Sequence, residues 1–63
     1  MQKLKEIRES QAMSIRDLAK EAGISPSTLH RIEQGKTATR VRWVTQRKLA
    51  KALGVQPKDI DFT

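Results

Sequence analysis

The sequence predicts an all-α fold, a compact bundle of about five short helices in one domain that spans residues 1–63. Helix-forming residues dominate, and no segment alternates polar and apolar residues as a half-buried strand would. The two prolines and three glycines punctuate the chain and divide it into helices. Because so short a chain buries only about 60% of the surface that its unfolded form exposes, its core has to be economical.

The first two predicted helices are separated by a short connection. The first covers residues 2–11, and its apolar stripe contains Arg8, a charge that requires a partner in such a position. The second begins after Ser14, which together with Asp17 resembles a capping box, and it ends at Gly23. A helix this short has to dock on its neighbours in order to persist.

The third predicted helix has the sharpest boundaries. Ser25 is a strong N-cap, Pro26 occupies the first helical position, and Gly35 provides the stop. A fourth helix is predicted over residues 43–53, and residues 56–60 read as one more short helical turn.

Composition and charge exclude several functions. There is no cysteine, which rules out disulfides, thiolate metal sites and cysteine nucleophiles, and the single histidine cannot supply a multi-histidine site. We therefore expect no metal, no cofactor and no enzymatic activity. No apolar run approaches the ~20 residues of a membrane-spanning helix, so the expected location is the cytoplasm, at the nucleoid. The net charge of +6 favours a polyanionic partner such as nucleic acid.

Residues 15–34 have the pattern of a helix-turn-helix. Ala19 is small where two helices would cross closely, and Gly23 can adopt the positive φ that the turn needs. The apolar residues that would meet beneath the crossing are Leu18, Leu29 and Ile32. In such a motif the second helix enters the major groove of DNA.

The segments SIRDLAKEAGISPSTLHRIEQGK (residues 14–36) and KLAKALGV (residues 48–55) carry a family resemblance, as does the opening LKEIRE. The chain resembles the phage repressor and Cro-like (XRE-type) helix-turn-helix proteins, which have the lambda-repressor-like fold. The resemblance implies a sequence-specific regulator that binds double-stranded DNA, most simply a repressor at an inverted-repeat operator. It also implies a homodimer, and whether this dimer forms only on DNA stays open.

The resemblance also assigns roles by position. The residues at the family's base-reading positions are Pro26, Ser27 and Arg31. The residues expected to flank these or to contact phosphate are Thr28, His30, Gln34, Lys36, Arg40 and Arg42. Arg8 and Glu33 match a structural ion pair of the family. Among the three base-reading residues, Arg31 has a guanidinium group that can donate hydrogen bonds to both O6 and N7 of guanine.

Two apolar features leave alternatives open. Trp43, at the start of the fourth helix, is predicted to be a core anchor rather than a base-stacking residue. The C-terminal apolar residues Val55, Ile60 and Phe62 can cover the core or face a protein partner. The second of these readings supports a different function, that of an antitoxin or another protein-interaction module of the same fold that regulates its own promoter.

Overall fold

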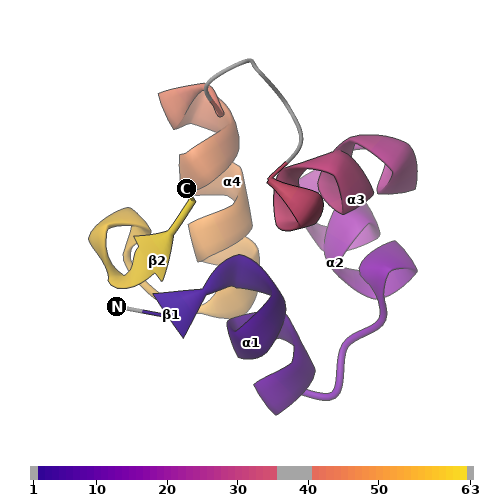
Figure 1. The fold of residues 1–63 in the computed structure, drawn as a ribbon, viewed down its shortest axis with the longest axis horizontal. Helices are drawn as coiled ribbons and strands as arrows, with labels where there is room; N and C mark the ends of the chain where they lie inside the picture. Colours follow the sequence, from indigo (N-terminus) through magenta and orange to yellow (C-terminus); the bar gives the residue numbers. More distant parts are fainter. Residues whose placement is uncertain (1, 36–40, 63) are drawn as a thin grey trace.

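The computed structural model describes residues 2–35 and 41–62. This part of the chain forms the helices α1 (Leu4–Ser10), α2 (Ile15–Ala22), α3 (Pro26–Gln34) and α4 (Trp43–Leu53), and the 3₁₀-helix η1 (Pro57–Asp59). The helices surround a common centre, and α4 runs up the middle of Figure 1 with α2 and α3 on one side and η1 on the other. The predicted helical bundle is confirmed, with η1 as its short fifth helix.

Local capping groups set the boundaries of α2 and α3. Ser14 Oγ accepts a hydrogen bond from the backbone N–H of Asp17 at 3.0 Å, and the backbone N–H of Ser14 donates to Asp17 Oδ2 at 3.1 Å. The backbone N–H of Ser14 holds the pKa of the Asp17 carboxyl below its usual range. Ser25 Oγ accepts from the backbone N–H of Thr28 at 3.1 Å. The predicted capping box and the predicted N-cap are therefore both confirmed.

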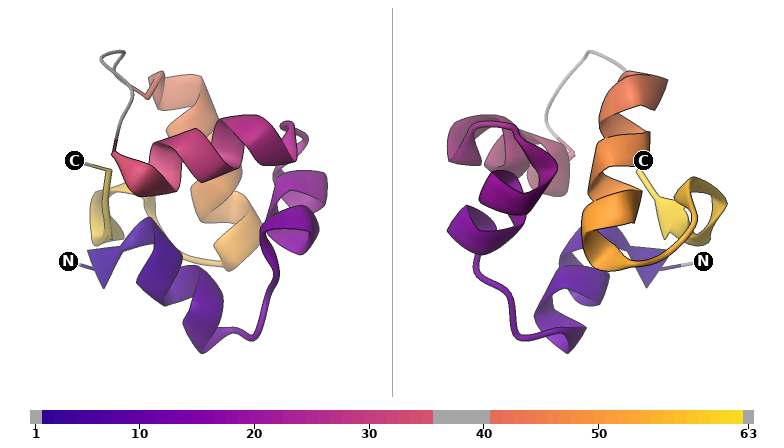
Figure 2. Two further views of the ribbon diagram at one scale, coloured as in Figure 1. Left: turned by 45° about the vertical axis from the view of Figure 1, so that its right-hand side comes forward. Right: turned by 180° about the vertical axis from the view of Figure 1, so that it is seen from behind.

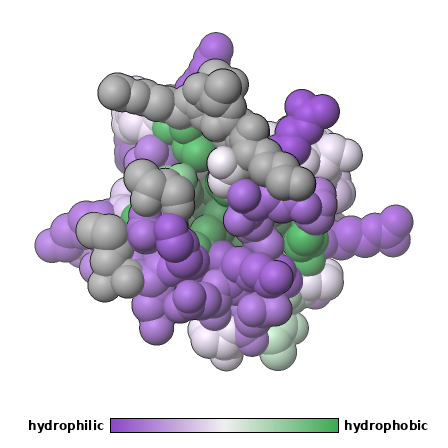
Figure 3. Space-filling view, in the orientation of Figure 1, coloured by the Kyte–Doolittle hydropathy of each residue, from purple (hydrophilic) through white to green (hydrophobic). Residues whose placement is uncertain are grey.

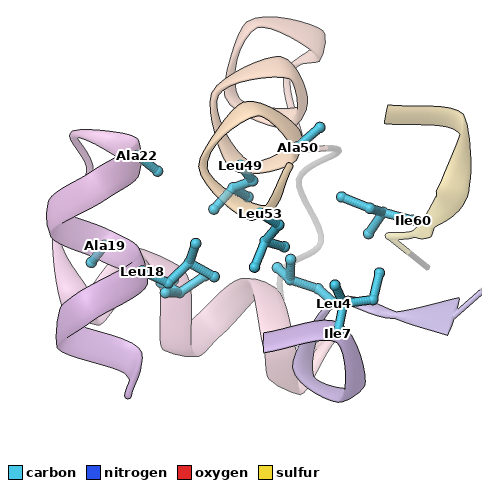
Figure 4. Close-up of a cluster of buried hydrophobic side chains, with 10 residues drawn as sticks. Leu4, Ile7, Leu18, Ala19, Ala22, Leu49, Ala50, Leu53 and Ile60 are labelled. Atoms are coloured by element: carbon cyan, nitrogen blue, oxygen red, sulfur yellow. The ribbon is translucent and has the colours of Figure 1, made fainter. Parts of the chain in front are cut away.

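The core lies where α1, α2, α3 and α4 meet. Its three largest fully buried side chains are Leu18 of α2, Leu29 of α3 and Leu49 of α4. Figure 4 shows side chains from α1, α2 and α4 converging on one centre. The other buried apolar residues are Leu4, Ile7, Ala19, Ala22, Ala50, Leu53 and Ile60.

The two ends of the described chain form a minimal parallel sheet. β1 (Gln2–Lys3) pairs with β2 (Ile60–Asp61), with Gln2 opposite Ile60, and a Lys3–Asp61 salt bridge of 3.1 Å accompanies the pairing. The prediction that the first helix starts at residue 2 is therefore wrong, and α1 begins two residues later. Two-residue strands are too short to show the alternation that identifies strands in a sequence.

The prediction that Trp43 anchors the core is also wrong. Its side chain is 64% exposed, and the Arg47 guanidinium carbon lies 5.3 Å from the centroid of its ring. Trp43 is seven residues before the buried Ala50 and so on the same face of α4, which explains the prediction. It lies about 10 Å farther along the helix axis, however, beyond the part of α4 that contributes to the core.

Candidate nucleic-acid interface

The conformation of the turn between α2 and α3 is fixed by the C-terminal end of α2 and by the N-cap of α3. Gly23 has φ 72°, a left-handed conformation that ends α2, and the N–H of Ile24 donates to the carbonyl of Ala19 at 2.9 Å. Ala19 itself is 1% exposed, so α2 packs closely on its neighbours there. Ser25 then caps α3. The two helices leave this turn in different directions and pack against each other (Figures 1 and 2).

Helix α3 has one buried face and one exposed face. Leu29 is completely buried, and Ile32 packs against the core cluster. The exposed residues of α3 are Pro26, Ser27, Thr28, His30, Arg31 and Gln34. The left view of Figure 2 shows α3 lying across the front of the molecule. All six α3 residues that the sequence analysis assigned to contacts with DNA are therefore at the surface.

Thr28 and Arg31 differ in whether their polar groups have partners within the protein. Thr28 Oγ1 accepts a hydrogen bond from Ser25 Oγ at 2.7 Å, so its hydroxyl is engaged with the helix cap. Arg31, in contrast, forms no salt bridge with any carboxylate in the described part of the chain. Its guanidinium therefore retains its donors for a ligand outside the protein.

The start of α4 is a second positively charged element. Arg42 is the exposed N-cap residue of α4, and no side chain accepts a hydrogen bond from the first-turn N–H groups among the described residues. Gln46 Nε2 donates to the carbonyl of Val41 at 3.0 Å and so fixes the entry to this helix. Free N–H groups and a positive helix end attract anions. Lys36 and Arg40, the other loop cations of interest, lie outside the described residues.

A buried ion pair supports α3 from below. Arg8 Nε donates to Glu33 Oε2 at 2.7 Å, and Arg8 Nη2 donates to Glu33 Oε1 at 3.0 Å. Arg8 Nη1 also donates to the carbonyl of Met13 at 2.8 Å. Both charged side chains are below 10% exposed, and the bond to Glu33 raises the pKa of Arg8. One guanidinium thus joins α1, the connection to α2 and the last turn of α3.

Sequence reasoning missed two contacts that shape this region. Nothing in the sequence pattern indicates that Gln46 bonds to Val41 or that Arg8 bonds to the Met13 carbonyl. Both acceptors are main-chain carbonyls, which every residue carries, so residue type gives no signal for them. The burial of Arg8 in an apolar stripe was the only sign that its donors had to be satisfied inside the protein.

Two short helices joined by a three-residue turn, with the second helix exposing a polar face, define a helix-turn-helix DNA-binding unit. Residues 2–62 match a family model described as a helix-turn-helix domain, and the chain belongs to this family. No curated protein and no solved structure matches the chain significantly. Within residues 2–35 and 41–62, no helix has the length and apolar character needed to span a membrane.

Proposed function

We propose that the protein is a sequence-specific transcriptional regulator, most simply a repressor, that binds an inverted-repeat operator in double-stranded DNA as a symmetric dimer. It acts at the nucleoid in the cytoplasm. The observation that carries the proposal is the exposed polar face of α3. The opposite face of this helix packs into the core through Leu29. A rigid helix with exposed hydrogen-bonding groups fits the major groove.

The contacts divide into those that specify sequence and those that position the protein. Arg31 reads a guanine with its two-pronged donor set, and Ser27 bonds a neighbouring base. Pro26 contributes shape at the start of the helix because its side chain has no polar atom. Arg42 and the N-terminus of α4 bind backbone phosphate. The remaining flanking contacts fall to Thr28, His30, Gln34, Lys36 and Arg40.

We expect Arg31→Ala to relax base preference at one position of each half-site. The loss of a bidentate contact to guanine removes about 1–3 kcal/mol of discrimination. Selection of bound duplexes with the variant and the parent chain measures this directly. Unfolding temperature should be unchanged, because Arg31 is exposed and lies outside the core cluster. An unchanged sequence logo would show that Arg31 does not read bases.

We expect Arg42→Ala to weaken binding to all duplexes by a similar factor. A phosphate contact carries no sequence information, and its loss lowers the slope of log K against log[salt] by about 1. Titrations of a specific and a random duplex over a salt series measure both effects. Lys5→Ala is the matched control, because Lys5 is an exposed cation on α1. A change in specificity without a change in slope would contradict the phosphate assignment.

Selection from a random duplex library at near-physiological salt tests the function as a whole. An enriched inverted repeat, with half-site centres about 10 bp apart, is the expected result. Binding without any enriched sequence, which disappears as salt rises, would reduce the interface to a nonspecific basic surface.

The alternative function, a protein-interaction module, requires the C-terminal apolar residues to be accessible to a partner. Ile60 is only 4% exposed and belongs to the core cluster, so it cannot face a partner as the sequence alternative required. Val55 and Phe62 are half-buried and pack against the same cluster. Ile60 therefore covers the core, whereas Val55 and Phe62 pack on it and keep part of their surface accessible.

A further inference from the structure

An apolar groove lies along the exposed face of α4, beside η1. Its volume is about 420 Å³. Trp43 and Val44, which line it, are 64% and 46% exposed and are the exposed large hydrophobic residues of the described chain. Ala50, Val55 and Pro57 complete its apolar surface. None of the α3 residues proposed to read DNA lines this groove.

The polar rim of the groove is cationic. Arg47, Lys48 and Lys51 line it, and within residues 2–35 and 41–62 no acidic residue does. None of these three forms a salt bridge with a carboxylate of the described residues. Between Glu33 and Asp59 the sequence contains seven of its 13 Lys and Arg residues and no Asp or Glu. Apolar side chains and positive charges without a carboxylate partner among the described residues therefore share one surface.

Figure 3 shows one face of the molecule. There, hydrophilic side chains dominate the surface and hydrophobic residues show mainly in a central hollow between them. A tryptophan that is nearly two-thirds exposed departs from this pattern. In the view from behind (Figure 2, right) α4 lies at the front of the molecule, with η1 beside it.

We propose that this groove docks an acidic segment of a partner protein, with apolar anchor side chains that insert between Trp43 and Pro57. Trp43 and Lys51 are eight residues apart, which is about 12 Å along the helix and matches about two turns of a bound helix. The apolar anchors supply most of the affinity. The acidic flanks pair with Arg47, Lys48 and Lys51 and set the orientation.

Charge and shape argue against two other occupants. A second copy of the chain docked groove to groove would bring two sets of like charges together, which is costly when they are desolvated. Single-stranded nucleic acid favours successive aromatic platforms for its bases. Among the described residues of the lining Trp43 is the only aromatic one, and the remaining apolar surface is aliphatic.

The chain carries its own reporter for the test. Trp43 is the only tryptophan and there is no tyrosine, so intrinsic fluorescence reports on the groove alone. The probe is a synthetic amphipathic peptide of Glu and Ala with two Leu residues one helical turn apart. We expect a saturable blue shift of the emission as the anchors bury the indole. Matched peptides with Lys in place of Glu, or Ala in place of Leu, should leave the spectrum unchanged.

Variants locate the binding site. Val44→Asp and Lys51→Glu should each raise the Kd of the Glu–Leu peptide about tenfold, measured by anisotropy of the labelled peptide. Lys5→Glu makes the same charge reversal on α1, away from the groove, and should leave the Kd unchanged. Circular dichroism of each variant checks that it is folded, and all three positions are exposed.

Three results would overturn the proposal. The first is the absence of a saturable shift with the Glu–Leu peptide. The second is a blue shift that grows with protein concentration alone, together with a dimer in sedimentation that Val44→Asp abolishes, because the occupant would then be a second copy. The third is displacement of the bound peptide by single-stranded oligothymidine that quenches Trp43, which would assign the groove to nucleic acid.

Discussion

Glu33→Ala should lower the free energy of unfolding by about 3–5 kcal/mol, because it leaves the buried Arg8 guanidinium without its carboxylate. Arg8 is 7% exposed, and its three hydrogen bonds go to Glu33 and to the carbonyl of Met13. For a chain of 63 residues the total stability is roughly 3–9 kcal/mol at typical values per residue. The substitution is therefore expected to remove much of the folded population.

Glu9→Ala is the control for this experiment. It removes the same charge from an exposed position of α1, where a contribution of about 0–1 kcal/mol is usual. Glu33→Gln keeps one acceptor oxygen and should fall between the two. Thermal and denaturant unfolding of the three variants give the comparison. Equal losses in Glu33→Ala and Glu9→Ala would mean that the ion pair contributes nothing to stability.

Leu29→Ala should destabilise the fold by about 2–5 kcal/mol, the cost of a large-to-small change in a packed core. Leu29 is completely buried and is the side chain of α3 that enters the core most deeply. Because it faces away from the exposed surface of α3, its effect on DNA binding should come only through unfolding. Chemical denaturation, followed by duplex titration at a temperature where the variant is folded, separates the two effects.

Leu29→Met is the matched control, because it nearly conserves volume and usually costs less than about 1.5 kcal/mol. Leu29 and Arg31 together then make a paired test: one substitution should lower stability and keep base preference, and the other should do the reverse. If Leu29→Ala changed the selected DNA sequence while the protein remained fully folded, the division of α3 into two faces would be wrong.

The sequence was sufficient for features that depend on neighbouring residues. Ser14, Gly23 and Ser25 act within one turn of the chain, so their capping roles follow from residue type and spacing alone. The position of Trp43 depends instead on how far along α4 the other elements extend, which helical periodicity does not report. The pairing of β1 with β2 joins residues nearly sixty positions apart, and no local pattern encodes it.

In the candidate site, too, the features set by local sequence were predictable and those set by distant contacts were not. The exposed face of α3 follows from helical periodicity once Leu29 is taken as buried. In the structure Leu29 is buried and the polar face of α3 is exposed. The partner of Arg8 came from family resemblance, because an apolar stripe shows that a charge needs a partner without showing which. The groove beside Trp43 was not predicted, because it is formed by α4 together with residues 55–57, which fold back beside it.

The pairing of β1 with β2 also has a consequence for how the molecule can be tethered. It brings Gln2 and Ile60 side by side, and both strands lie on the side of the molecule away from the first turn of α3 (Figures 1 and 2). A label, a solid support or a fused module could therefore be attached beside either strand without covering the first turn of α3. Two attachments, one at each end, would emerge as neighbours, so a short linker could close the chain into a ring.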